Sequence, residues 1–438
     1  MKLVYKFFAL FFLLPCIAVE AQNSVQPTSD SLTLAAVISK VITNYPSVKK
    51  AEQEIEAANA RIGLAKSAYY PNVDLSSSYS HIGPTSSITM PGLGTFNLYP
   101  VDNYSAAVNI NQTIYDFGKT DKSITLENQS KELSKLSVEQ LKQRLSLSLV
   151  GNYYSIVFLQ EAIRIKDEEL KNLNEHLTFV EKKAATGSAT QYEILTTKVR
   201  ISTIENQKTD LQTSLQVQQC QLNSFLGQPE QSALPVKKEL RAFELIGANP
   251  SLITSALDQR DEMKIARQRS MVASTRYKMV DAQNNPVFNF FASGGWKNGY
   301  LPNEVKPIAN YVVGVGFKLP IFDATRAKYS RLQVKSEISS TEQDTELARR
   351  SIVNEVVESR ANVEAAHKKV AQSELQLKQA QQAYALAETS FQAGVITNLD
   401  LLDSSTSLAE SRLALMKTKI DYTVSLLKLK IALGEHIY

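Results

Sequence analysis

Two halves of this chain carry the same landmarks in the same order, and this duplication limits the possible folds more than any other feature. Three landmarks recur 207 residues later: Tyr115-Asp116 as Phe322-Asp323, Gly187 as Gly394, and Leu226-Gly227 as Leu433-Gly434. The stretches between the landmarks have therefore kept the same length. Internal repetition of this kind predicts two copies of one structural unit, which we place at residues 22–235 and 236–438.

The beginnings of the two halves align at a different offset. Pro71 matches Pro286, which lies 215 residues later. The first copy therefore carries eight extra residues between Pro71 and Asp116. Each copy is predicted to consist of a helix, a variable strand hairpin, a very long helix, a turn and another long helix.

The longest predicted helix lies in the second copy. No Gly or Pro occurs from Ala324 to Ala393, and large apolar residues recur every seven positions: Val356, Val363, Val370, Leu377, Tyr384 and Phe391. Small residues follow three positions after the large ones, which gives the a/d heptad of a coiled coil. The 71 residues from Asp323 to Gly394 would make a helix roughly 105 Å long. One returning helix cannot cover it, so we expect helices from the other half and from other chains alongside.

Four segments alternate apolar and polar residues, as half-buried strands do. They lie at about 72–82, 103–115, 287–296 and 310–319. Ten residues is the length of a membrane-spanning strand in a barrel. Aromatic residues near the segment ends fit an interfacial girdle, although tyrosine is equally common in soluble sheets: Tyr79, Tyr99, Tyr104, Trp296, Tyr300 and Tyr311. The turn-rich connections, 83–102 and 297–309, are predicted to be external loops.

Four strands are too few to close a barrel. An open sheet edge in lipid would leave backbone hydrogen-bonding groups without partners, and single-chain barrels begin at eight strands. We therefore expect two or three chains to share one barrel, and each chain to add its helices to one tube.

The N-terminus predicts export. Lys2 and Lys6 flank the start of an apolar stretch at 7–19, and a plausible cleavage site follows, so residues 1–21 read as a signal peptide. Cys16 follows a proline rather than a small residue, which argues against lipid attachment. Removal of the signal would leave Cys220 as the only cysteine and exclude an intrachain disulfide.

Composition and motifs argue against catalysis. Lys+Arg and Asp+Glu number 48 and 44, and no basic cluster is interleaved with aromatics, so we expect no nucleic-acid partner. The four histidines lack metal-ligand spacing: His81, His176, His367 and His436. Because the chain also lacks a phosphate-binding loop and a nucleophile elbow, we expect no catalytic residue, no metal and no cofactor.

Several motifs in a fixed order resemble the TolC family of outer-membrane efflux and secretion channels. They are the tandem repeat, Pro71 and Pro286 before strands, TIYDFGK and PIFDATR before long helices, and AGxxTxxDLLDxxTSL from Ala393 to Leu408. The resemblance covers about residues 30–438. It implies a mainly α fold with a β-barrel part: a homotrimer whose twelve strands form one outer-membrane barrel, continuous with a periplasmic tube of twelve helices.

The resemblance also implies partners. The channel would be a passive exit duct, opened by a periplasmic adaptor protein and energised by an inner-membrane transporter of the RND or ABC type. A soluble periplasmic coiled-coil scaffold or adaptor is the alternative. It would explain the heptads but not the duplicated strands.

The same resemblance makes Gly187 and Gly394 the turns of two periplasmic hairpin tips. In the family, the constricted entrance lies there, with an acidic ring on the second hairpin. Asp400 and Asp403 match these positions, and their i,i+3 spacing puts both on one helix face. Threefold symmetry would gather six carboxylates around a narrow mouth and favour cations. The alternative is that the helix dipole favours Asp near a helix N-terminus regardless of function.

The entrance departs from the family pattern in one respect. Some relatives hold it shut with an Arg two residues after this Gly and a Tyr three residues before it, where this chain has Ile396 and Phe391. Our hypothesis is an apolar gate in which Phe391 and Ile396 plug the mouth, joined by Leu399 and Leu402. The alternative is that these residues pack between the helices of the hairpins.

Overall fold

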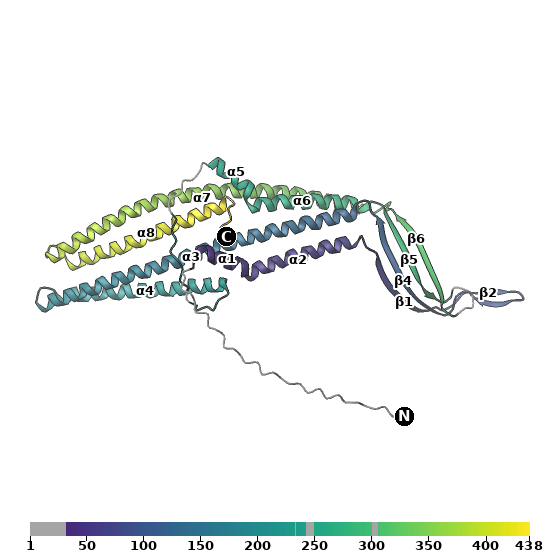
Figure 1. Cartoon of the computed structure of the whole chain (residues 1–438), viewed down its shortest axis with the longest axis horizontal. Coiled ribbons are helices and arrows are strands. Elements are labelled where there is room, and N and C mark those ends of the chain that lie inside the picture. Colours follow the sequence, from purple (N-terminus) through teal and green to yellow (C-terminus); the bar gives the residue numbers. More distant parts are fainter. Residues whose placement is uncertain (1–31, 233, 242–248, 300–304) are drawn as a thin grey trace, which may run out of the picture.

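The computed structural model describes residues 32–232, 234–241, 249–299 and 305–438. The predicted signal peptide, Cys16 and Tyr300 lie outside these residues. The helices lie at one end of the elongated molecule and a curved sheet lies at the other (Figure 1). None of the described helices is long and apolar enough to cross a membrane.

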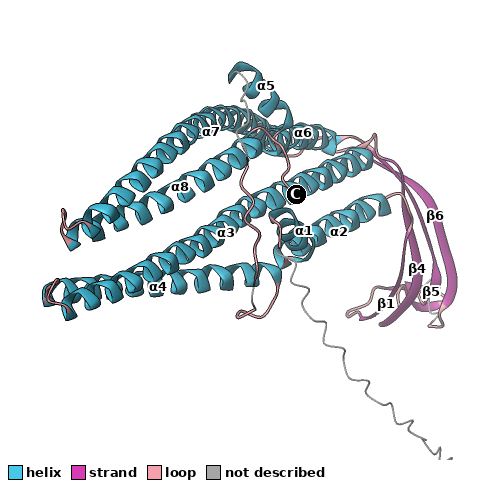
Figure 2. Cartoon of the chain, turned by 60° about the vertical axis from the view of Figure 1, so that its left-hand side comes forward, coloured by secondary structure: helices cyan, strands magenta, loops and turns pink. Residues whose placement is uncertain are grey.

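The helices follow the duplicated order. They are α1 (Leu34–Asn44), α2 (Pro46–Ser67), α3 (Lys119–Ala185) and α4 (Gln191–Leu226) in the first copy, and α5 (Asn249–Gln259), α6 (Asp261–Asp281), a short 3-10 turn (Ala282–Asn284), α7 (Arg326–Gln392) and α8 (Asn398–Ala432) in the second. The α3–α4 and α7–α8 pairs form two hairpins that lie side by side (Figure 2), with α3 packed against α8.

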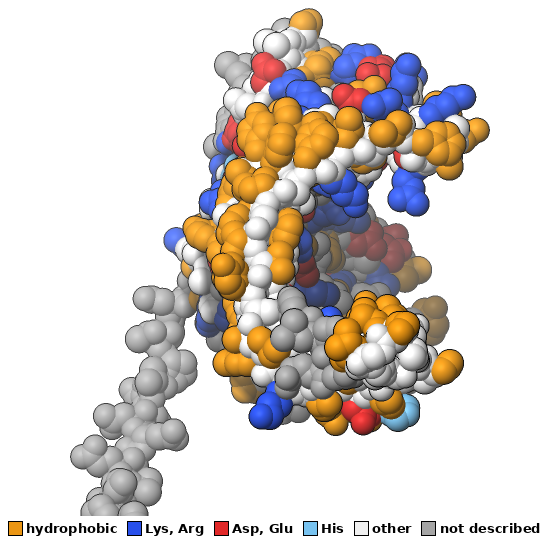
Figure 3. Space-filling view, turned by 90° about the vertical axis from the view of Figure 1, so that its right-hand side faces the viewer, with side chains coloured by type: hydrophobic (Ala, Val, Ile, Leu, Met, Phe, Trp, Pro, Cys, Tyr) orange, Lys and Arg blue, Asp and Glu red, His pale blue; other side chains and the backbone are white. Residues whose placement is uncertain are grey.

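The main sheet is antiparallel and has the order β1-β4-β5-β6. Its strands are β1 (Asn72–His81), β4 (Asp102–Tyr115), β5 (Val287–Lys297) and β6 (Ile308–Lys318). The register lines up Asp74, Asn109 and Ser293 on one face, whereas Leu75, Val108 and Tyr311 share the other. The sheet therefore has one polar and one apolar face. Figure 3, which looks onto the sheet end, shows hydrophobic side chains along its whole curve.

Side chains on the polar face bond to one another across strands. The Asn109 amide donates to Asp74 Oδ2 at 2.9 Å and to Ser76 Oγ at 3.0 Å, and Ser293 Oγ donates to Asn109 Oδ1 at 2.9 Å. The apolar face instead carries aromatic pairs at both ends. The rings of Tyr79 and Tyr104 lie 5.2 Å apart near the loops, and those of Phe288 and Phe317 lie 4.9 Å apart near the helices.

The connection at 83–102 contains a second hairpin, so the prediction that it is only a loop is wrong. Strands β2 (Ser87–Met90) and β3 (Gly94–Asn97) pair antiparallel there. Gly92 and Gly94 reverse the chain with φ of 80° and 93°, a conformation that favours glycine. Each strand has only four residues, and the surrounding turn residues hid the alternation.

The repeated aspartates after the strands are helix caps. The carboxylate of Asp116 accepts the backbone N–H of Gly118 at 3.1 Å and that of Thr120 at 2.8 Å. In the second copy Asp323 accepts the N–H of Ala327 at 2.9 Å. Both carboxylates satisfy donors that the first turn of a long helix leaves free, which explains why the landmark recurs.

The largest core lies midway along the helices, where α1, α3, α4 and α8 meet. Its heptad residues in α3 include Leu149 and Ile156, which are fully buried. The Tyr153 hydroxyl lies 2.9 Å from the carbonyl oxygen of Leu32 and 2.6 Å from that of Lys237. It therefore ties the segment before α1 to the segment that links the two copies.

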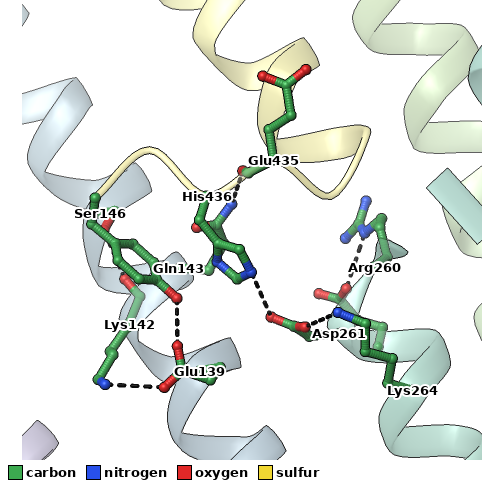
Figure 4. A network of polar contacts seen from close by, with 11 residues as sticks. Glu139, Lys142, Gln143, Ser146, Arg260, Asp261, Lys264, Glu435 and His436 are labelled. Atoms are coloured by element: carbon green, nitrogen blue, oxygen red, sulfur yellow. Dashed lines mark hydrogen bonds and ion pairs between the residues drawn. The ribbon is translucent and has the colours of Figure 1, made fainter. Parts of the chain in front are cut away.

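The C-terminal segment also joins the copies (Figure 4). The Gln143 amide, on α3, donates to the backbone oxygen of Glu435 at 2.7 Å, and the Tyr438 hydroxyl donates to Glu139 at 2.7 Å. On the other side, His436 lies 3.9 Å from the carboxylate of Asp261 at the start of α6. The segment thus contacts the first copy and the second.

We expect Tyr153→Phe to destabilise the helical core by about 1–2 kcal/mol, because the one hydroxyl proton that the carbonyls of Leu32 and Lys237 share is lost. The measurement is the midpoint of thermal unfolding in detergent, followed by circular dichroism. Tyr99→Phe is the matched control, since the Tyr99 side chain is exposed in the connection at 83–102, away from the helical core. Equal midpoints for the two variants would contradict the role given to the Tyr153 hydroxyl.

Candidate functional site

Each hairpin turns through the same backbone motif. Gly187 and Gly394 both have φ of 75°. Around the first, Gly187 N–H donates to Ala184 O at 3.0 Å and Ser188 N–H to Lys183 O at 2.8 Å; around the second, Gly394 N–H donates to Phe391 O and Val395 N–H to Ser390 O. This pair of bonds is a Schellman motif, which needs a left-handed residue after the helix and so favours glycine.

The helix after each turn begins with a capping box. Thr190 and Glu193 form it at α4, and Thr397 and Asp400 form it at α8. The Asp400 carboxylate accepts the N–H of Thr397 at 2.9 Å and its hydroxyl at 2.6 Å. These bonds, the hydroxyl first, lower the pKa of Asp400, so this carboxylate stays ionised at lower pH than an ordinary one.

The two aspartates predicted for the acidic ring therefore differ in their surroundings. Asp400 is exposed and lies in the first turn of α8, as the alternative interpretation had it, and it is bonded to its own cap, which that interpretation did not predict. Asp403 is exposed one turn later, and within the described part of the chain it has no hydrogen bond or ion pair. In the first copy, Glu193 is the equivalent of Asp400. Thr196 is the equivalent of Asp403, and its hydroxyl donates to backbone oxygens of its own helix.

The four residues predicted for an apolar gate do not form one cluster, although Phe391 and Ile396 pack together. Phe391 is only 6% exposed and packs among Val180, Ile194 and Leu401. Leu402 is only 5% exposed and packs in a cluster with Leu173, Ile201 and Ile204. Both residues thus fill the space between the hairpins of one chain, which is the alternative that the sequence left open.

The other two gate candidates are more accessible. Ile396 is partly buried against the cluster around Phe391, whereas Leu399 is 57% exposed. Val395, which the sequence reasoning did not single out, is 76% exposed in the turn itself. Exposed apolar side chains at the tip of the second hairpin are therefore Val395 and Leu399.

A polar junction between the hairpins was also missed from sequence. Asn398 is 5% exposed, and its Oδ1 accepts from Nε2 of His176 at 2.5 Å while its amide donates to Thr197 Oγ1 at 3.2 Å. It therefore joins α3, α4 and α8 at one point. The sequence offered one signal for this junction. Asn398 directly follows the capping residue Thr397, at a position where an apolar residue would be expected to begin the buried face of the helix.

Further polar contacts connect the hairpins along α8. The Arg200 guanidinium, on α4, donates to Thr406 Oγ1. The Arg412 guanidinium donates to Glu168 of α3 at 3.2 Å. Together with Asn398, these residues bond α8 to the first hairpin at three successive positions along the helix. Side-chain hydrogen bonds therefore join the two hairpins of one chain in addition to the apolar packing between them.

Comparison with known proteins identifies the family. The family model described as outer membrane efflux protein matches the chain twice, at residues 37–228 and 252–435, once in each copy of the repeat. The chain belongs to the outer membrane efflux protein family. It is therefore an outer-membrane efflux channel of the TolC type and not an enzyme, which confirms the resemblance and excludes the soluble scaffold.

Relatives of this efflux channel cover almost the whole chain. Outer membrane protein TolC of Escherichia coli K12 is 20% identical over 437 residues, 96% of this chain and 86% of TolC. Cation efflux system protein CusC of the same strain is 22% identical over 414 residues, 91% of this chain and 85% of CusC. Among solved structures, CusC has a TM-score of 0.77 at 19% identity, covering 98% of this chain and 99% of that one. The Campylobacter jejuni CmeC outer membrane channel has a TM-score of 0.76 at 16% identity, covering 92% and 85%.

We expect Asn398→Ala to loosen the tips of this efflux channel, at a cost of about 1–3 kcal/mol. The part-buried ring N–H of His176 loses its acceptor, and the buried Thr197 hydroxyl, which still donates to Glu193 O, loses the amide that donates to it. Hydrogen–deuterium exchange should show amides around both turns exchanging roughly tenfold faster. Asn174→Ala is the matched control, since Asn174 is exposed and bonds only within its own helix. Unchanged exchange at the tips would contradict the stabilising role given to Asn398.

Proposed function

We propose that three copies of this chain form one passive exit duct from the periplasm to the outside. A periplasmic adaptor would open it, and an inner-membrane transporter of the RND or ABC type would supply the energy. The observation that carries this proposal is the four-stranded sheet, which has one apolar face and two unpaired edges, β1 and β6. In lipid such edges need partners, and β6 of one copy can pair with β1 of the next.

The exposed faces of the helices also support packing between neighbouring copies of the chain. Because α3 packs on α8, α4 and α7 lie on the outer flanks of the two hairpins. The tip of α4 carries Tyr192, Leu195 and Val199 on one exposed stripe, and α7 carries the exposed Leu386 near its own tip. The exposed apolar stripe on α4 of one copy can pack against α7 of the next copy. A long amphipathic helix normally buries its apolar stripe against another element.

The entrance would then lie at the hairpin tips. Asp400 and Asp403 from three copies would make the acidic ring, and Val395 and Leu399 would be the apolar side chains nearest the mouth. The capping role of Asp400 is compatible with the ring, because the capping bonds leave its second carboxylate oxygen free to face the opening.

The first test is the protein mass of the detergent-solubilised particle from outer membranes, corrected for bound detergent. We expect three times the mass of the processed chain. The double variant Leu195→Asp/Val199→Asp should weaken the helical part of the assembly and lower its dissociation temperature. A monomer in the soluble fraction would refute the shared barrel.

We also expect Asp400→Asn combined with Asp403→Asn to reduce the cation-over-anion permeability ratio in planar bilayers by about half or more. Glu193→Gln is the matched control, since it removes the charge of the equivalent cap on the first hairpin. Because the pKa of Asp400 is lowered, the wild-type preference should persist as pH falls to about 4, where an ordinary Asp is already about half protonated. If the double variant keeps its selectivity, the ring is not at these aspartates.

A further inference from the structure

A cavity of about 400 Å³ lies between the two hairpins next to their tips, with Phe391 and Gln392 of the second turn in its lining. Helix α3 supplies Glu175, His176 and Phe179 to its walls, and α7 supplies Tyr384, Glu388 and Phe391, over a floor formed by α8. Sites that hold small molecules in proteins have volumes of about 300 to 1,000 Å³. The cavity is therefore large enough for a small organic compound.

Aromatic rings make up much of the cavity wall. The ring of Phe391 lies 5.3 Å from that of His176 and 6.2 Å from that of Phe179. The Lys183 ammonium sits 5.0 Å from the ring centroids of both Phe179 and Phe391. The faces of these rings thus already attract a positive charge of the chain itself, as expected from the quadrupole of an aromatic ring.

Two carboxylates at the cavity have no counter-charge of their own. Glu175 and Glu388 are exposed and form no ion pair with any residue in the described ranges. Burial raises the pKa of Tyr384, and the charges of both glutamates raise it further, whereas Arg412 opposes them. Arg412 is itself bonded to Glu168. Against the one ammonium of Lys183 over the rings, the cavity has the two carboxylates of Glu175 and Glu388, so these three groups together carry a net negative charge beside the aromatic wall.

We propose that this cavity binds a small aromatic organic cation. The aromatic rings would contact its flat apolar part, and Glu175 and Glu388 would neutralise its charge at the cavity opening. The site is separate from the acidic ring, because its acids lie on α3 and α7 rather than on α8. Binding needs only a folded chain, so this proposal stands or falls separately from the proposed assembly and its partners.

The test is a titration of the full-length protein in detergent with N-methylquinolinium, a fluorescent aromatic cation, followed by its fluorescence. The neutral 1-methylnaphthalene has the same shape and is the matched ligand. We expect saturable binding of the cation at one site per chain. The neutral compound should partition into the micelle without saturating.

Variants separate charge from shape. Glu175→Gln/Glu388→Gln should weaken cation binding at least tenfold, whereas Glu342→Gln/Glu358→Gln, which removes two exposed charges far up α7, should leave it unchanged. Tyr384→Leu should also weaken it, because an aromatic face is lost while apolar volume remains. The proposal fails if the cation does not saturate, if the neutral compound binds as well, or if both glutamate pairs have equal effects; circular dichroism confirms that each variant is folded.

Discussion

Backbone hydrogen bonding along the open edges of a four-stranded sheet is the constraint on which the rest of this structure depends. Within the sheet each strand has a neighbour on both sides except β1 and β6. An outer-membrane protein cannot leave those edges bare in hydrocarbon. The proposed trimer follows from this requirement, and it also accounts for helices that are far longer than one chain can cover. Sheet and helices therefore impose the same need for neighbouring copies.

Much of this arrangement could be predicted from sequence, because periodic patterns report directly on long regular elements. The heptads predicted the long helices, and residues such as Val356 and Val363 are fully buried as a positions should be. Alternation likewise placed the strands of the main sheet within about two residues of their observed bounds. The hairpin at Ser87–Asn97 was missed because strands of four residues give too short a pattern.

Side-chain roles at the tips were harder to predict, since they depend on three helices meeting in space. Nothing in the local sequence distinguishes a buried Asn398 that binds His176 from a solvated asparagine in a first helical turn. Phe391 and Leu402 match gate positions by alignment to a glycine, yet tertiary packing places both between hairpins. The capping role of Asp400 was open to prediction, because Thr397 stands three residues before it. The two copies have kept the turn and the cap, which the backbone needs, and have diverged at Thr196 and Asp403, which it does not.

The polar face of the sheet has a consequence for whatever moves along it. The side-chain amide of Asn109 donates to Asp74 and Ser76, and its side-chain oxygen accepts from Ser293. The hydroxyls of Ser78 and Ser105 lie 2.8 Å apart. Groups already satisfied by their neighbours offer little further attraction to a passing molecule. If this face lines the duct, its wall is wetted, and the neutral side chains on it offer few free donors to hold a passing solute.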